Sequence, residues 1–406
     1  DYPRVQGLAE MMNSYGVIHN DPEVVSKIVA SQAHHKKIDG HAPGLQGKDL
    51  DTYVAAGVYS DHECATMEDA LAKLQRGQFI MIREGTAARN LEALAPLLTP
   101  QYAERCMFCT DDKHPSDLLE KGHIDYIARE AINKYGVDPI IAVKAACHHA
   151  SRYFLLNNRG AIAPGYLADF AVIDNFKDFN VEMVFKKGVL YWNNGELRDF
   201  EAPKIEEYLD KRAHDTFHVS TLTPDDFRDT RQRGVLGMVP GEIITTDNGY
   251  ADHVDLEKDI LKIAVVERHK GTHHIGLGYI QGYGLKSGAV ATSISHDSHN
   301  IIVVGTNSAD MAFAANYIVE HHGGIVVVEN GTVKGSVVLE IAGIMSDRPL
   351  TEVNDQLEAA KDAAFTLGVS RGIDPFMTLS FMALPVIPKL RITTRGVVDV
   401  DTQQYV

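Results

Sequence analysis

Short apolar segments recur about every 20 to 30 residues through the first 150 residues, and segments with helical periodicity separate them. The expected strands are residues 5–8, 37–39, 57–59, 79–82 and 106–108. Strands and helices that alternate in this way are typical of βα units and a parallel sheet, so an α/β fold is predicted. A closed barrel needs eight such units, and we expect three further strands before Asp1.

Local signals predict where two of the helices begin. Asp21 and Pro22 supply a cap and a first-turn proline for one of them. Ser116 is expected to cap a second helix, whose apolar positions continue to Ala131 and which ends near Gly136.

The rest of the chain predicts further domains. Short alternating segments with turn dipeptides predict a small β module, and a charged stretch after it is typical of a linker. The last part predicts a separate α/β domain, with strands at 301–304, 324–328 and 336–340 and helices at 311–321 and 354–367. The predicted divisions are residues 1–152, 153–200, the linker 201–232 and 233–406.

Composition limits the partners and the location. A net charge of −16 without a basic patch argues against a nucleic-acid partner. No apolar run reaches the length of roughly eighteen residues that a membrane span needs, so no membrane partner is expected. Four cysteines are too few for a disulfide framework and fit a reducing compartment, so we expect a cytoplasmic protein.

Metal-capable side chains follow four of the expected strands. They are Glu10, His41, the pair His62 and Glu63, and the pair Asp111 and Asp112. The carboxyl ends of barrel strands converge on one mouth, where imidazoles and carboxylates together suit a divalent cation. The alternative is that each residue is satisfied separately in its own loop. Four such positions in register favour the metal site.

Other motifs have weaker chemical meaning. Cys106 and Cys109 have CxxC spacing, but they lie within an apolar strand and are expected to be small core residues. Arg105 precedes Cys106, so the PCxxC part of the zinc nucleobase deaminase signature is absent. The glycines of residues 276–282 are misspaced for a dinucleotide fingerprint and are expected to form a turn. His296 and His299 are expected to make structural contacts rather than to bind metal.

Several segments resemble the adenine deaminases of the amidohydrolase superfamily. They are residues 7–13 (GLAEMMN), 39–44 (DGHAPG), 60–63 (SDHE), 81–85 (MIREG), 110–112 (TDD), 160–174 and 284–299. The first five resemble the segments at strands four to eight of that family's barrel. The resemblance therefore implies a (β/α)8 amidohydrolase barrel with strands 4–8 in this chain, a small β-sandwich and an extra C-terminal α/β domain.

The resemblance also implies a binuclear metal site. Glu10 would bridge the two ions, His41 and His62 would bind one of them, and Asp111 would bind the other. Manganese is the metal that the resemblance favours, and the ligand set also suits iron or zinc. The family's His-x-His pair at strand one does not occur in this chain, and we expect it upstream of Asp1, because a barrel without three strands would expose open sheet edges.

The implied activity is the hydrolysis of adenine to hypoxanthine and ammonia in purine salvage and adenine catabolism. Asp111 would accept a proton from a metal-activated water and return it to the leaving amine. Glu63 would contact the purine ring or only orient His62. The base pocket would be lined by Arg83, Glu84 and Asp112.

Two alternatives to adenine hydrolysis remain. The chain would otherwise be another amidohydrolase, acting on a cyclic amide or an amino-heterocycle, or a non-catalytic remnant that lacks the His-x-His strand. The large extra domain favours a homodimer or a higher homo-oligomer.

Overall fold

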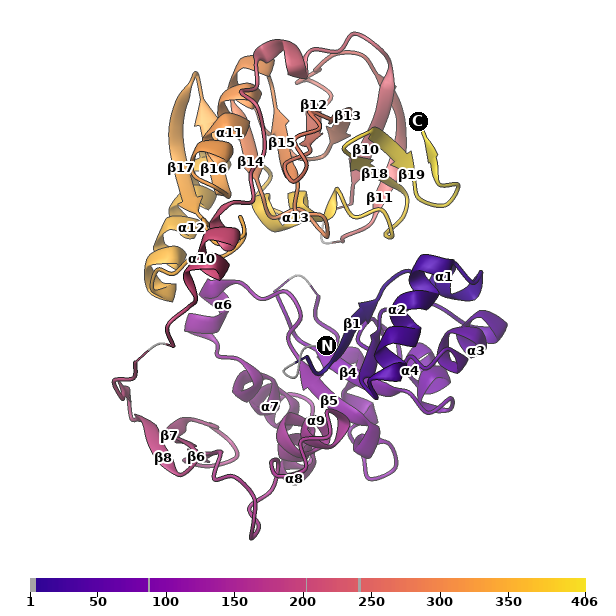
Figure 1. The fold of residues 1–406 in the computed structure, drawn as a ribbon, viewed down its shortest axis with the longest axis vertical. Helices are drawn as coiled ribbons and strands as arrows, with labels where there is room; N and C mark the ends of the chain where they lie inside the picture. The colour runs from indigo at the N-terminus through magenta and orange to yellow at the C-terminus, as the bar shows by residue number, and fades with distance from the viewer. Residues whose placement is uncertain (1–4, 87, 202, 240–241) are drawn as a thin grey trace. The chain divides into compact units, whose positions relative to one another are not determined.

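The protein is described by a computed structural model of residues 5–86, 88–201, 203–239 and 242–406 (Figure 1). Contacts between residues divide the chain into two compact units, Asp1–Ala202 and Pro203–Val406. The division lies at the start of the segment that was expected to be a linker. Among the described residues, no helix is both long enough and apolar enough to cross a membrane.

The first unit opens with five short strands that alternate with helices, as predicted. The strands are β1 (Gly7–Met11), β2 (Lys37–Gly40), β3 (Ser60–Asp61), β4 (Phe79–Arg83) and β5 (Cys106–Cys109). The α-helices are α1 (Ser14–Ile18), α2 (Pro22–Ala33), α3 (Gly47–Ala55), α4 (Met67–Leu74), α5 (Leu91–Leu94), α6 (Pro115–Glu120), α7 (Ile124–Asn133), α8 (Pro139–Val143) and α9 (His149–Tyr153). Short 3-10 turns lie at Ala95–Leu97 and Ala103–Arg105, and a π turn, Lys144–His148, joins α8 to α9.

The five strands are parallel and follow one another in sequence order. β1 pairs with β2, and β3, β4 and β5 pair in that order. Tyr59 connects the two sheets, because its N–H donates to Ile38 O at 2.9 Å and its carbonyl accepts from Phe79 N at 2.8 Å. This order is the one that βα units produce, since each helix returns the chain to the same end of the sheet.

Two strands are displaced from their predicted positions. β1 begins at Gly7 rather than at residue 5, and β3 is Ser60–Asp61 rather than residues 57–59. A Cβ on Gly40 would lie 2.1 Å from Ser60 O, so β2 and β3 approach closely only because residue 40 is glycine. The close contact falls at Ser60, one residue beyond the end of the expected strand.

One helix boundary was predicted well and the other was not. Asp21 caps α2, because its Oδ1 accepts from the N–H groups of Glu23 and Val24. The single helix expected from Ser116 to Ala131 is wrong. Gly122, with φ +100°, separates α6 from α7, so the chain turns in the middle of the apolar pattern.

A small antiparallel sheet ends the first unit, in agreement with the predicted β module. Its strands, in order, are β6 (Phe170–Ile173), β7 (Val181–Lys186), β8 (Val189–Asn193) and β9 (Glu196–Leu197). None of the residues in these four described strands is fully buried.

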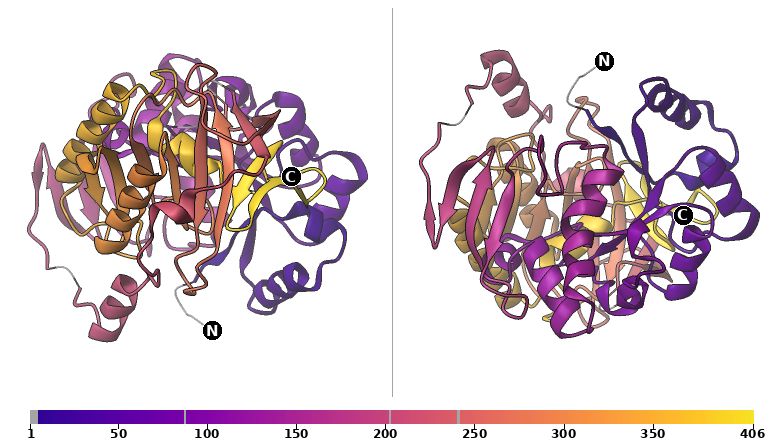
Figure 2. Two further views of the ribbon diagram at one scale, coloured as in Figure 1. Left: turned by 90° about the horizontal axis from the view of Figure 1, so that it is seen from above. Right: turned by 90° about the horizontal axis from the view of Figure 1, so that it is seen from below.

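The second unit is built on an eight-stranded sheet (Figure 2). Its strands, in spatial order, are β11 (Thr245–Ala251), β10 (Arg233–Met238), β13 (Ile275–Gln281), β12 (Ile260–Val266), β15 (Ile301–Gly305), β14 (Ala289–Thr292), β16 (Gly324–Glu329) and β17 (Thr332–Val338). A smaller sheet contains β18 (Leu390–Thr393), β19 (Gly396–Asp399) and β20 (Gln404–Tyr405). The helices are α10 (Glu207–His214), α11 (Ser308–Glu320), α12 (Leu350–Thr366) and α13 (Pro375–Phe381), with a 3-10 turn at Pro224–Phe227.

Helices cover both faces of the large sheet. α11 packs on the face that carries Val303 and Val326. α12 packs on the other face, where Gly335 of β17 allows Ala360 to approach. The predicted strands and helices of this region are present, although β17 begins four residues before the expected residue 336. Neighbouring strands are antiparallel except for β10 and β13, so the unit is sheet-rich rather than a series of βα repeats.

Two expectations for the second unit are corrected by the packing. Part of the expected linker 201–232 belongs to the hydrophobic core, because Leu222 and Phe227 are buried against residues of α11. The glycines of residues 276–282 lie mainly within β13 rather than in a turn. A Cβ on Gly278 would lie 2.4 Å from Val397 Cγ2, so glycine there allows β19 to pack on β13.

Candidate metal centre

The four predicted metal ligands lie together at the ends of β1, β2, β3 and β5 in the first unit. Glu10, His41 and His62 form one group of metal-capable atoms, and His62 forms another with Glu63 and Asp111. Within each group the ligand atoms all lie within 4.8 Å of one another. The strand order explains this, since the carboxyl ends of parallel neighbours meet at one edge of the sheet.

His62 lies at the centre of the cluster. Its Nε2 is 3.8 Å from Glu10 Oε1, 3.5 Å from Glu63 Oε1 and 4.0 Å from Asp111 Oδ2. The ring of His41 lies edge-on to it, with 5.3 Å between the ring centroids. Three carboxylates from three different strand ends therefore surround one imidazole.

The two carboxylates that begin and end this series have unusual backbone conformations. Glu10 has φ +43° and lies in a bulge of β1, where the pairing shifts between Leu8 and Met11. Asp111 has φ +58° directly beyond β5. Non-glycine residues seldom adopt the left-handed region, and such residues concentrate at functional sites. The bulge redirects the side chain of Glu10 relative to a regular strand.

A buried tyrosine fixes His41 relative to the strand that carries Glu10. The hydroxyl of Tyr53 accepts from His41 N at 3.0 Å and donates to Met11 O at 2.6 Å. Tyr53 has no exposed surface. The hydroxyl thus holds the ends of β1 and β2 at a fixed separation. No sequence pattern pointed to this residue.

Arg83 contacts two carboxylates of the cluster. Its guanidinium donates to both oxygens of Glu63, with 2.9 Å between Nη2 and Oε2, and Nη1 donates to Asp111 Oδ2 at 2.7 Å. Asn90 Oδ1 accepts from Nε at 2.7 Å and holds the guanidinium in place. Arg83 is buried, and its hydrogen bonds link two carboxylates of the cluster.

The other two predicted pocket residues are oriented by local contacts. Glu84 Oε2 accepts from Leu91 N at 3.3 Å, at the start of α5. Burial raises the pKa of Glu84 above its usual range. Asp112 donates its backbone N–H to Asp111 Oδ1 and accepts from Thr86 N through its carbonyl. The cluster of metal-capable groups contains neither residue.

Electrostatic effects in the cluster favour positive charge. Burial alone would lower the pKa of His41, but the nearby carboxylates of Glu10 and Glu63 outweigh it and raise the pKa. For Asp111, burial acts to raise the pKa, but the hydrogen bond and the charge of Arg83 prevail and lower it. Asp111 therefore stays ionised, in the form that accepts a proton or binds a cation.

The residues fit a divalent cation. His41 Nδ1 is buried and has no hydrogen-bond partner, although the carboxylates of Glu10 and Glu63 lie 3.6 and 3.5 Å away. A buried polar atom without a partner is costly, and a cation between the imidazole and the carboxylates would satisfy it. Mixed nitrogen and oxygen donors suit manganese, iron and zinc.

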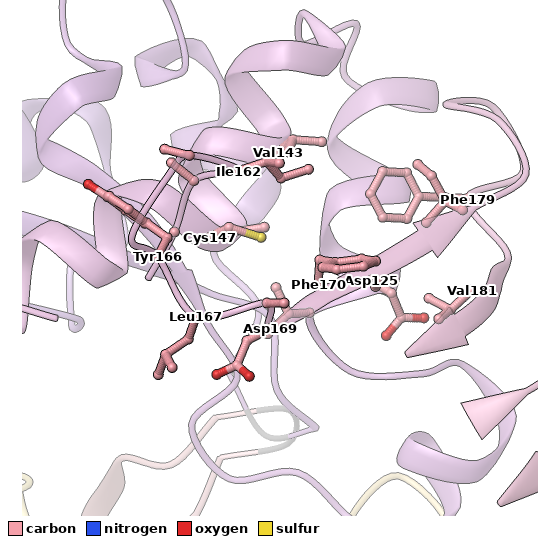
Figure 3. A pocket seen from close by; sticks show the side chains of 18 of the residues that line it. Asp125, Val143, Cys147, Ile162, Tyr166, Leu167, Asp169, Phe170, Phe179 and Val181 are labelled. Atoms are coloured by element: carbon pink, nitrogen blue, oxygen red, sulfur yellow. The ribbon is translucent and has the colours of Figure 1, made fainter. Parts of the chain in front are cut away.

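A cavity of about 730 Å³ lies elsewhere in the first unit, between α7, α8 and the π turn on one side and the small sheet on the other (Figure 3). Its lining is largely apolar and includes Ile162, Tyr166, Phe170 and Phe179. None of the cluster residues lines it. The cavity is therefore separate from the cluster of metal-capable residues.

The cysteine and histidine motifs have structural contacts. Cys106 is buried and burial raises its pKa to about 12, in agreement with a core role, whereas Cys109 is a half-buried free thiol. In the second unit, the ring of His296 stacks on Phe381 at 4.8 Å, and His299 Nδ1 accepts from Ser295 N at 3.2 Å. This pair is not among the metal-capable groups of the described residues.

Comparisons with known proteins agree with this organisation. Residues 6–191 match the amidohydrolase family, and residues 242–404 match the adenine deaminase C-terminal domain. The chain is 45% identical to an adenine deaminase of Desulfatibacillum aliphaticivorans, over 100% of this chain and 72% of the relative. It is 42% identical to adenine deaminase 2 of Carboxydothermus hydrogenoformans, over 99% of this chain and 71% of the relative.

A solved structure of β-aspartyl dipeptidase from Fervidobacterium islandicum AW-1 is 17% identical, with a TM-score of 0.40, over 49% of this chain and 59% of the other. The two family matches cover the first unit and most of the second, and the relatives align with the whole chain. The chain therefore belongs to the adenine deaminase family, with a TIM-barrel amidohydrolase region followed by a sheet-rich domain.

Proposed function

We propose that the cluster of Glu10, His41, His62 and Asp111 is the metal site at which this protein hydrolyses adenine to hypoxanthine and ammonia. The observation that carries the proposal is the convergence of these four side chains at four strand ends. The substrate follows from the family, since curated relatives that align with the whole chain are named adenine deaminase. On this basis β1 to β5 are strands 4–8 of the barrel, and β6 to β9 are part of the small β-sandwich.

Glu10, His41, His62 and Asp111 would hold a binuclear metal site. The amidohydrolase family generally uses divalent metals, and we propose manganese as the native one. When bound, such ions lower the pKa of water towards neutrality and so supply the nucleophile for attack on the purine ring.

Asp111 is the proposed proton carrier. Its carboxylate is ionised and borders the imidazole of His62, which places a proton acceptor beside the metal ligands. It would take a proton from the attacking water and give it to the amine that leaves the ring. The hydrogen bond from Arg83 keeps the carboxylate in one orientation during both transfers.

Glu63 is proposed as the residue that orients the two imidazoles rather than as a donor to the purine ring. Its Oε1 lies 3.5 Å from both His41 Nδ1 and His62 Nε2. Both of its oxygens accept hydrogen bonds from Arg83. With both oxygens engaged by the guanidinium, the carboxylate is directed at Arg83 and the imidazoles rather than at a substrate.

The residues that line the base pocket are proposed from their positions in the chain. We propose that Glu84 and Asp112 border the adenine, since Glu84 directly follows Arg83 and Asp112 directly follows Asp111. We also propose a cytoplasmic homodimer or higher homo-oligomer that acts in purine salvage; the four free thiols fit a reducing compartment.

The substrate is tested with the manganese-loaded, full-length protein. We expect hypoxanthine and ammonia in equal amounts from adenine, and loss of both products after chelation, because water loses its activation when the ions are removed. Chromatography and an ammonia assay measure the products. Turnover of a cyclic amide with adenine left intact would show that the substrate is wrong, although the metal site would stand.

Arg83→Lys tests the proposed role of the guanidinium. Lysine keeps the charge but cannot donate to Glu63 and Asp111 together in the planar geometry of arginine. We expect kcat/KM for adenine to fall roughly tenfold, with nearly normal metal content, as for loss of a partner of a metal ligand. Arg76→Lys is the matched control, because Arg76 pairs with the exposed Asp51. Equal activity in the two variants would remove Arg83 from the mechanism.

A further inference from the structure

A fully buried lysine lies beneath the metal-capable cluster. Lys73 belongs to α4 and has no exposed surface. Its ammonium donates to Asp61 Oδ2 at 3.0 Å, to Asp69 Oδ2 at 2.9 Å and to Ala42 O at 2.7 Å. An ammonium has three donors, so all of them are used. A buried charge is costly, and one that is retained with every donor satisfied indicates a specific requirement.

Asp61, Cys64 and Asp69 also have the arrangement of a small metal site. The ammonium of Lys73 already lies between the two carboxylates and 3.6 Å from Cys64 Sγ. It therefore occupies the place where a metal ion would have to bind. The cation of this second cluster is the lysine itself.

The partners of the lysine lie next to the proposed metal ligands in the chain. Ala42 follows His41, and Asp61 precedes His62. Asp61 Oδ1 accepts from Ala42 N at 2.7 Å, so the lysine and the aspartate together bind both backbone polar groups of Ala42. Asp61 Oδ2 also accepts from Glu63 N at 3.0 Å. One ion pair thus joins the loop after β2 to the loop after β3.

We propose that Lys73, paired with Asp61, is a positioning residue that holds the His41 and His62 loops at the separation that metal binding requires. The inference rests on the proposed metal site. The pair touches the backbone beside the ligands and not the ligands themselves, so it acts on where the imidazoles are held. A lysine on a helix can serve this purpose because α4 provides a regular backbone that holds the base of the Lys73 side chain.

The test compares two variants that differ only in the ion pair. The control is Asp69→Asn, which keeps Lys73 and Asp61 as a neutral pair and leaves both loop contacts intact. The test variant adds Lys73→Met and Asp61→Asn to this background. Removing both charges together avoids an unpaired buried charge, which would destabilise the fold for an unrelated reason.

We expect the Kd for Mn²⁺, measured by calorimetry on full-length protein stripped of metal, to rise roughly tenfold to a hundredfold in the test variant relative to Asp69→Asn. Hydrogen exchange in the same metal-free samples should increase in residues 41–46 and 60–66 but not in β15 of the second unit. A purely structural role would lower the melting temperature without a change in the Kd.

An unchanged Kd in a folded test variant would overturn the proposal, and so would unchanged exchange in both loops. If the test variant does not fold, Lys73→Gln with Asp61→Asn in the Asp69→Asn background replaces it, since one amide donor group remains and no buried charge is left unpaired. A smaller rise in the Kd would then support the proposal, and a control-like Kd would overturn it. If the control itself binds no Mn²⁺, the proposed metal site fails, and the exchange measurement alone decides whether the pair positions the loops.

Discussion

Asp111→Asn is expected to retain its fold and part of its metal but to turn over adenine at least roughly a hundredfold more slowly, the lower range for a lost acid–base group. An amide oxygen still coordinates a cation weakly and still accepts the hydrogen bond from Arg83, which is 2.7 Å long in the structure. The amide cannot accept a proton at neutral pH. The attacking water therefore loses its proton acceptor, and the leaving amine loses its donor. Steady-state kinetics at saturating metal measure the effect.

Asp112→Asn is the matched control for this prediction. Asp112 contacts Asp111 through its backbone N–H, which the substitution preserves. We expect a milder effect on kcat, because Asp112 is not among the metal-capable groups of the described residues. A severe loss in Asp112→Asn, together with nearly normal turnover in Asp111→Asn, would mean that the proton carrier is the neighbouring aspartate.

Glu10→Gln and His41→Ala are each expected to lose bound metal as well as activity. Both side chains are proposed to bind metal directly, so the loss of affinity should exceed the roughly tenfold to hundredfold that removal of an outer partner costs. Loss of a ligand lowers both the amount of bound metal and the acidity of the water that the remaining metal binds. We therefore expect kcat/KM to fall by a larger factor than the metal content does. Elemental analysis after dialysis, in parallel with kinetics, gives both quantities.

Two exposed residues of the same types serve as controls for these variants. Glu68→Gln changes an exposed residue of α4, and His253→Ala changes a side chain that is 76% exposed in the second unit. Both should retain normal metal content and turnover. Metal content in Glu10→Gln and His41→Ala that equals the content of these controls would show that neither side chain binds the ions.

The convergence of the strand-end side chains was predictable from the sequence because a parallel sheet brings the carboxyl ends of its strands together. Once β2 and β5 were recognised as strands, His41 and Asp111 had to lie beyond the same edge, whatever the details of packing. The prediction did not depend on exact strand limits. His62 came to the correct place although β3 lies later in the chain than expected.

The role of Glu63 was less predictable, because it depends on contacts between distant residues. The direction of this side chain depends on the loop after β3, where the N–H of Glu63 donates to the buried Asp61. Arg83 completes the arrangement from a residue 20 positions away. The periodicity of apolar residues predicts which face of a strand is buried, but it does not predict which polar side chains form hydrogen bonds with one another.

The errors in the predicted fold also have local causes. The apolar pattern after Ser116 is continuous, yet Gly122 ends the first helix with a positive φ. Leu222 and Phe227 stand within a charged segment, and only the core around α11 shows that they are buried. In each case tertiary packing or one backbone angle outweighed the average character of the surrounding residues.

Glu10, His41, His62 and Asp111 are proposed to hold the catalytic ions together. Anomalous diffraction at the manganese edge, from crystals of the full-length, manganese-loaded protein, locates those ions. We expect two anomalous peaks, with Glu10 within coordination distance of both and with His41, His62 and Asp111 each within coordination distance of one. Peaks away from these side chains, or a fully active protein without manganese at this cluster, would contradict the proposal.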